Sequence, residues 1–265
     1  MNYFVEGLQG SGKSTLIKRL SELHPENKTL TEGDYSPVEL AWCAYMGKDD
    51  YRRVLERYPD LRDEISSKSH EEGDHMIVCF TKIPTENRGF YQDLEQYEIY
   101  NNRRTFEDFR DIVLTRYKNW TEDNLICECS LFQNIVEDML LFRDKTDEEI
   151  MDLYREIKQS IGDKEIHIAY IKTAPVDIRN NLDTARKERV DDKGNEVWFQ
   201  MLCGFFDNSP HAERNGLKGA DGLIRHWTHR QELELRICEE IFAGQYTVLP
   251  SKSYGDRELE DFVIR

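Results

Sequence analysis

The sequence predicts an α/β fold of three layers, with about five parallel strands between helices and a helical insertion. Short apolar segments rich in β-branched and aromatic residues alternate with segments whose apolar residues recur every three or four positions. This alternation is typical of a parallel sheet with helices on both faces. No internal repeat or interdomain linker interrupts the 265 residues, so we expect a single domain over 1–265.

The expected elements follow in order. A first strand at Tyr3–Val5 precedes a glycine-containing loop and a helix with Leu16, Leu20 and Leu23 on one face. A second strand is expected at Lys28–Glu32. Residues 36–120 form the insertion, whose periodicity is helical, with breaks near Pro59, Gly73, Pro84 and Gly89. The remaining strands are expected at Asn124–Glu128, Ile166–Ile171 and Tyr246–Leu249, with helices at 178–189 and 222–242 and a turn at Asp191–Asn195.

Composition narrows the possible partners. The chain carries 36 Lys plus Arg against 52 Asp plus Glu, a formal charge of −16. We therefore expect it to bind neither nucleic-acid polymers nor anionic membrane surfaces. No apolar segment approaches the roughly 18 residues that a membrane span needs, and no secretory signal precedes the first strand, so a cytoplasmic location is expected. The six cysteines form no C-x-x-C pair and are interpreted as reduced core residues. Whether the chain forms a homodimer stays open.

The first loop contains the phosphate-binding pattern Gly7-x-x-x-x-Gly12-Lys13-Ser14, also called Walker A. Glycines let successive N–H groups point at phosphate oxygens, and the following helix adds its dipole. Lys13 would contact the β- and γ-phosphates of ATP, and Ser14 would ligate Mg²⁺. The alternative is a flexible turn, which the position between a strand and a helix disfavours. The candidate cofactor-binding residues are Gly7, Gly10, Ser11, Gly12, Lys13, Ser14 and Thr15.

The segment from Phe4 to Thr15 resembles the opening of thymidylate kinases, and the rest of the scaffold, 1–35 and 124–250, resembles deoxynucleoside kinases. Both are P-loop kinases, so the resemblance implies an Mg-ATP-dependent transferase acting on a small molecule, most simply a nucleoside or nucleotide. At the end of the third strand, deoxynucleoside kinases have Glu-Arg-Ser. Here Glu128 would hold Mg²⁺, while Cys129 stands in place of the arginine, whose contribution must come from elsewhere or be absent.

Two further sites follow from the resemblance. Glu32 matches in placement the carboxylate that accepts the proton of the acceptor hydroxyl, with Asp34 as its rival; two solvated acids in a turn are the alternative. Arg186 and Arg189 resemble the arginines of a lid at about 179–200, where guanidinium groups stabilise the transferring phosphoryl group; a solvated helix face is the alternative. Lys13, Glu32, Arg186 and Arg189 are thus the candidate catalytic residues.

The insertion supplies candidates for an acceptor pocket, because aromatic walls with a few polar anchors suit a flat ring. About a third of them are expected to line a site. The candidates are Trp42, Tyr45, Tyr51, Arg52, Arg53, Phe80, Tyr97, Tyr100, Arg103 and Arg104.

Two other functions stay open at this point. One is a kinase of another hydroxylated small molecule, such as an antibiotic. The other is a nucleotide-dependent ATPase or switch with a protein partner, although the sequence has neither an Asn-Lys-x-Asp guanine signature nor an apolar strand ending in Asp-Glu.

Overall fold

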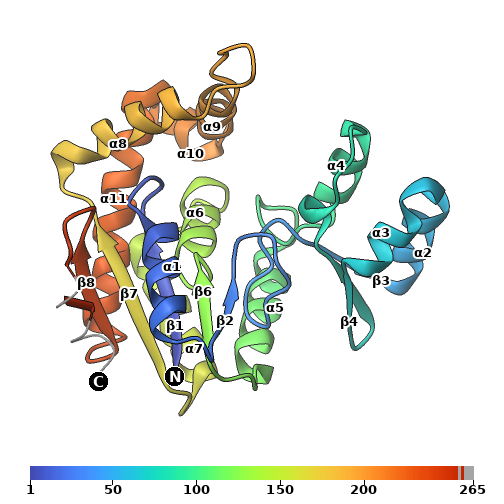
Figure 1. Cartoon of the computed structure of the whole chain (residues 1–265), viewed down its shortest axis with the longest axis horizontal. Helices are drawn as coiled ribbons and strands as arrows, with labels where there is room; N and C mark the ends of the chain where they lie inside the picture. The colour runs from blue at the N-terminus through green and yellow to red at the C-terminus, as the bar shows by residue number, and fades with distance from the viewer. Residues whose placement is uncertain (256–257, 260–265) are drawn as a thin grey trace. The chain divides into compact units, whose positions relative to one another are not determined.

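The chain divides into two compact units in the computed structural model, which describes residues 1–255 and 258–259 (Figure 1). Unit 1 comprises Met1–Thr29 and Asp123–Arg265, and unit 2 comprises Leu30–Glu122. Unit 2 thus covers the expected insertion and adds a few residues at each end. No helix among the described residues is both long and apolar enough to cross a membrane.

The main sheet has five strands in the order β2-β6-β1-β7-β8, and the parallel arrangement expected from the sequence is confirmed. The three central strands, β6, β1 and β7, are almost entirely buried, which explains their continuous apolar runs, while the edge strands β2 and β8 are partly exposed. The strands are β2 (Lys28–Leu30), β6 (Leu125–Glu128), β1 (Asn2–Gly7), β7 (Ile166–Lys172) and β8 (Tyr246–Pro250).

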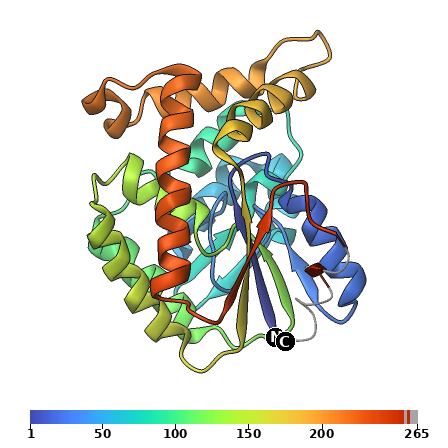
Figure 2. The same ribbon diagram turned by 90° about the vertical axis from the view of Figure 1, so that its left-hand side faces the viewer.

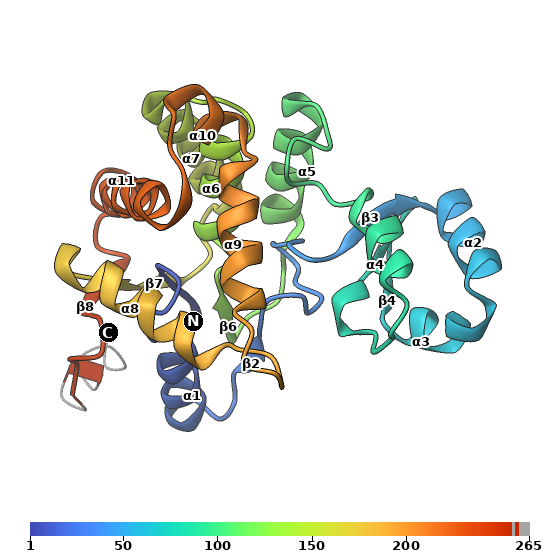
Figure 3. The ribbon, with the colours of Figure 1, turned by 90° about the horizontal axis from the view of Figure 1, so that it is seen from above.

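Helices cover both faces of this sheet, which gives unit 1 three layers. Helix α1 (Lys13–Leu23) lies on one face, and Figures 2 and 3 show α6 (Gln133–Leu141), α7 (Asp147–Ile161) and α11 (Gly219–Glu240) on the other. Thr146 and Glu149 form a reciprocal capping box that fixes the start of α7. The helix predicted at 222–242, before β8, is therefore confirmed as α11.

Three more helices of unit 1 gather at the end of the sheet where β1 and β7 terminate (Figure 1). They are α8 (Pro175–Glu188), α9 (Val197–Asp207) and α10 (Pro210–Asn215). Pro175 and Pro210 each occupy the first helical turn, where no intrahelical N–H donor is needed. Leu8, in the loop after β1, belongs to the same apolar cluster as Leu182 of α8 and Phe206 of α9.

Unit 2 differs from the expected wholly helical insertion, because it contains an antiparallel sheet in the order β3-β5-β4. Glu72 pairs with His75, so Gly73 and Asp74 form a two-residue hairpin turn, with Gly73 at a φ of 56°. The strands and helices of this unit are β3 (Ala44–Gly47), α2 (Lys48–Arg57), η1 (Pro59–Leu61), α3 (Arg62–Ser67), β4 (Ser69–Glu72), β5 (His75–Val78), η2 (Phe80–Lys82), α4 (Arg88–Glu95) and α5 (Phe106–Asn119).

Two of the predicted interruptions in unit 2 have physical causes in the structure. Pro59 begins η1 directly after α2 ends, as a residue without an N–H donor requires. The break expected near Gly89 lies just before it: α4 begins at Arg88, and the N–H of Gly89 donates to the Asn87 side chain that caps the helix.

Candidate functional site

The glycine loop between β1 and α1 has the backbone geometry that the sequence predicts. Gly7, Gly10 and Gly12 have φ values of 139°, 77° and 107°, all in the region that favours glycine. A Cβ on Gly7 would come within 2.6 Å of the Ile171 carbonyl oxygen of β7. Glycine at position 7 is therefore required both by conformation and by the close approach of the neighbouring strand.

Lys13 begins α1 and its side chain turns back into this loop. Only 8% of the residue is exposed. Its Nζ donates hydrogen bonds to the carbonyl oxygens of Gly7 at 2.9 Å and Leu8 at 3.1 Å, and to Oε1 of Gln133 at 3.2 Å. The ammonium group thus lies within the curve of the loop.

Ser14 and Glu128, the two residues predicted to hold Mg²⁺, are brought together. The Ser14 hydroxyl donates to Oε1 of Glu128 at 3.3 Å. Their neighbourhood follows from strand order, because Glu128 ends β6 and pairs with Val5 of β1. Among the described residues no three or more His, Cys, Asp and Glu side chains form a metal-binding group. A hydroxyl and one carboxylate nevertheless fit Mg²⁺, which keeps several waters and takes phosphate oxygens as further ligands.

We expect Glu128→Gln to reduce turnover and to raise the Mg²⁺ concentration needed for half-maximal activity, because the amide oxygen carries no formal charge. The fold should be unaffected. Cys129→Ser serves as the control and should leave the Mg²⁺ titration unchanged. An unchanged titration for Glu128→Gln would show that another carboxylate holds the metal.

Cys129 stands at the position where the resemblance would place an arginine. It is buried, has a φ of 54°, and its thiol donates to Oε1 of Gln133 at 3.4 Å. Gln133 therefore accepts from both Cys129 and Lys13. Nothing in the sequence singles out Gln133, because a glutamine near the start of a helix is ordinary.

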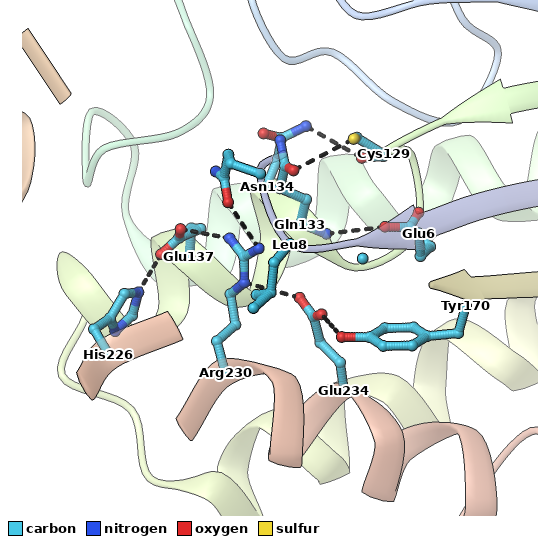
Figure 4. Close-up of polar contacts among 12 residues, drawn as sticks. Glu6, Leu8, Cys129, Gln133, Asn134, Glu137, Tyr170, His226, Arg230 and Glu234 are labelled. Carbon is cyan, nitrogen blue, oxygen red and sulfur yellow. Dashed lines mark hydrogen bonds and ion pairs between the residues drawn. The ribbon is translucent and has the colours of Figure 1, made fainter. Parts of the chain in front are cut away.

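A buried ionic network lies beside the glycine loop (Figure 4). Arg230 of α11 is fully buried. Its guanidinium donates to Oε1 of Glu137 at 2.5 Å and to Oε1 of Gln9 at 3.0 Å, and lies 3.2 Å from Oε1 of Glu234. Gln9 occupies one of the unspecified positions of the loop pattern, so Arg230 anchors the loop to α6 and α11.

His226 and Tyr170 lie at the two ends of this network and bind its two carboxylates. Figure 4 shows His226 bonded to Glu137, and Tyr170 donates to Oε2 of Glu234 at 2.5 Å. Burial alone would raise the pKa of Glu137, but His226 and Arg230 outweigh it and lower the pKa to about 2. Glu137 is thus ionised at neutral pH. The sequence does not reveal this network, since charged residues on helices, such as Glu137 and Arg230, are usually exposed to solvent.

Glu6 is a further buried acid that the sequence did not single out. Its carboxylate accepts the backbone N–H groups of Leu131 at 2.7 Å and Gln133 at 3.4 Å, which holds the segment after β6 against β1 (Figure 4). Burial raises the pKa of Glu6 to about 8. This residue therefore positions Gln133, and through it the end of the Lys13 side chain.

The two predicted lid arginines lie next to aromatic rings of α9. The Arg186 guanidinium is 4.5 Å from the centre of the Phe199 ring and forms an ion pair with Glu196 at 2.7 Å. The Arg189 guanidinium is 4.6 Å from the centre of the Trp198 ring. Between them, Asp191 accepts from Asn195 in the predicted turn. Residues 186–199 thus form a connected basic and aromatic segment.

We expect Mg-ATP to protect residues 186–199 from hydrogen exchange, because a lid that closes on phosphates would exclude water from its backbone. Arg189→Ala should lower kcat by about tenfold or more. Arg179→Ala, which removes from α8 a solvent-exposed ion pair with Asp221 of α11, is the matched control. Unchanged protection together with normal kcat for Arg189→Ala would support a solvated helix face instead.

Glu32 and Asp34 belong to unit 2, and their environments differ. Asp34 accepts from the backbone N–H and the hydroxyl of Thr31 at 2.9 and 2.6 Å, and lies 3.2 Å from Nζ of Lys82. Burial opposes ionisation of Asp34, but these bonds outweigh it and lower its pKa. With both oxygens engaged in a turn, Asp34 is the poorer candidate base. Glu32 is half-buried.

Unit 2 contains a cavity of about 420 Å³. Three of the ten residues proposed for an acceptor pocket, Tyr45, Tyr97 and Arg104, line it, and the Tyr45 ring stacks on His75 with centroids 4.3 Å apart. The remaining lining residues are Met46, Gly47, Asp50, His75, Asp108, Asp111 and Ile112.

The other candidates for the acceptor pocket have structural roles or lie on the surface. Arg52 and Arg53 form ion pairs with Asp49 and Asp50 on α2, and the Tyr100 hydroxyl donates to Oε1 of buried Glu39 at 2.5 Å. Phe80 lies in the core of unit 2, and Tyr51 packs against that core. Arg103 lies 3.8 Å from Glu95, and Trp42 is 49% exposed.

In comparisons with known proteins, neither a family model nor a curated protein matches the chain.

Proposed function

We propose that the chain is an Mg-ATP-dependent phosphotransferase of the P-loop kinase class, acting on a small-molecule hydroxyl acceptor such as a nucleoside or nucleotide. The observation that supports this most strongly is the arrangement around Lys13. A buried ammonium lies inside a loop of positive-φ glycines, between a strand and a helix, with Ser14 bonded to Glu128 nearby. These donors fit a polyphosphate and a hard cation, and the site needs no other cofactor than ATP and Mg²⁺.

Each residue has one task in this mechanism. The loop N–H groups and Lys13 bind the β- and γ-phosphate oxygens, and Ser14 and Glu128 hold Mg²⁺ or its waters. The metal supplies positive charge to the phosphate oxygens. Glu32 accepts the acceptor's hydroxyl proton, and Arg186 and Arg189 stabilise charge on the transferring group after exchanging their aromatic partners for phosphate oxygens.

The cavity in unit 2 favours a second candidate, a kinase of an amine-bearing alcohol. Three aspartates line the cavity against one arginine and one histidine, and tyrosine rings can face a cation. Its volume lies in the range typical of small-molecule pockets. An aminoglycoside antibiotic combines hydroxyl groups with several ammonium groups and fits this lining.

The test is a screen of ATP consumption by the full chain against nucleosides, nucleoside monophosphates and aminoglycosides. A kinase gives ATP turnover that depends on one acceptor class, and the phosphorylated product appears by mass spectrometry. Turnover that rises only with aminoglycosides would support the second candidate. ATP hydrolysis that no acceptor changes would overturn both and leave a nucleotide-dependent ATPase or switch.

A further inference from the structure

Cys43 and Cys79 lie side by side in unit 2, although 36 residues separate them in the sequence. The Cys43 thiol donates to the sulfur of Cys79 across 3.7 Å. Both thiols are free, and the residues are 0% and 3% exposed. We propose that these two cysteines form a dithiol site that is converted reversibly to a disulfide and that thereby controls the loop carrying Glu32.

The two backbones are placed for such a bond. Ala44 of β3 pairs with Val78 of β5 in antiparallel register, so Cys43 and Cys79 face each other one position beyond this pair. Cys43 directly precedes β3 and Cys79 directly follows β5, so both lie at the same end of this strand pair. The sulfur atoms must approach from 3.7 Å to about 2.05 Å, a change that side-chain rotation can supply.

The chemistry balances with a small disulfide such as oxidised glutathione as oxidant. The hydrogen bond from Cys43 lowers the pKa of Cys79, which favours its thiolate as the attacking group. Cys79 attacks one sulfur of the oxidant and releases one glutathione thiolate. Cys43, having lost its proton, then attacks the Cys79 sulfur and releases the second. Two thiols of the protein are oxidised, and one disulfide of the oxidant is reduced to two thiols.

The loop at Thr31–Asp34 is packed directly on this pair. The Cys43 sulfur lies 3.8 and 3.9 Å from the carbonyl oxygens of Gly33 and Asp34. Its single S–H proton can donate to these oxygens as alternatives to the Cys79 sulfur. Two residues after Cys79, the hydroxyl of Thr81 would be only 2.7 Å from a Cβ on Gly33. Disulfide formation consumes the S–H donor and draws Cys43 away from both carbonyls, so the loop must shift.

The first experiment counts thiols and does not depend on any activity. The full-length chain is equilibrated with reduced and oxidised glutathione at several ratios, quenched with acid, alkylated and mapped by mass spectrometry. Because both thiols are buried, equilibrium is measured rather than rate. We expect a Cys43–Cys79 linkage, with both thiols lost together and restored by dithiothreitol. The other four cysteines, Cys127, Cys129, Cys203 and Cys238, serve as internal controls.

A Cys43–Cys79 pair that stays reduced when the more exposed Cys203 has been converted to its glutathione adduct would overturn the proposal, as would linkage of either residue to a different cysteine. Cys79→Ser should leave Cys43 unlinked.

The effect on the loop rests on the proposed function and is tested separately. Oxidation should lower acceptor-dependent turnover about tenfold or more. This loss should be reversible and should not occur in Cys79→Ser. Linkage without a change in turnover would overturn the control of the loop, while linkage in a chain with no kinase activity would overturn the proposed function alone.

Discussion

We expect Lys13→Ala to lower acceptor-dependent ATP turnover by about 30- to 1,000-fold, which corresponds to about 2 to 4 kcal/mol of transition-state stabilisation. The reason is the position of its ammonium, buried inside the glycine loop within hydrogen-bond distance of the Gly7 and Leu8 carbonyls. A charge placed there without water around it acts on phosphate oxygens far more strongly than a surface lysine does. Steady-state kinetics with ATP titration separate the effect on kcat from the effect on KM.

The control is Lys18→Ala, which removes an exposed lysine from the same helix. Lys13→Ala also removes hydrogen bonds that hold the loop, so thermal unfolding of both variants is compared first. Wild-type ATP affinity and turnover in a folded Lys13→Ala variant would show that the loop does not bind phosphate. The kinase proposal would then fall with it.

The parts of the fold that the sequence predicts best are those set by local signals. The three central strands of the main sheet, β6, β1 and β7, are buried and apolar, and the glycine loop must follow the first strand of the chain, so pattern and spacing locate both. Lys13, Ser14 and Glu128 are found because one motif and one strand end specify them. Strand order then brings Glu128 to the loop, which sequence periodicity alone does not determine.

The parts that the sequence does not predict depend on contacts between distant segments. Strand β4 reads Ser-His-Glu-Glu, which has no apolar alternation, and only the Gly73-Asp74 turn indicates a hairpin. Arg230 and Glu137 look like solvated helix residues until α6 and α11 are packed together. The Cys43–Cys79 contact likewise requires the register of β3 with β5.

We expect Glu32→Gln to lower kcat by about 10² to 10⁴-fold with little change in ATP affinity, which is the usual effect of losing a positioned general base. The prediction holds for an acceptor that is a neutral alcohol, whose proton must leave as the phosphoryl group arrives. Asp34 is the alternative carboxylate, but Thr31 and Lys82 already occupy its oxygens. Glu86→Gln, at an exposed position of the same unit, is the matched control.

A monophosphate acceptor would give the opposite pattern, since it is already an anionic nucleophile and needs positive charge rather than a base. The arginine that the resemblance to deoxynucleoside kinases would place at position 129 is replaced by Cys129, and Arg52 and Arg53 are paired with aspartates on their own helix. A chain of charge −16 would therefore repel a dianion unless Arg103 or Arg104 bound it. If turnover requires a monophosphate and falls mainly in Arg104→Ala or Arg103→Ala, with Glu32→Gln nearly silent, the acceptor is a nucleotide and Glu32 is not the base.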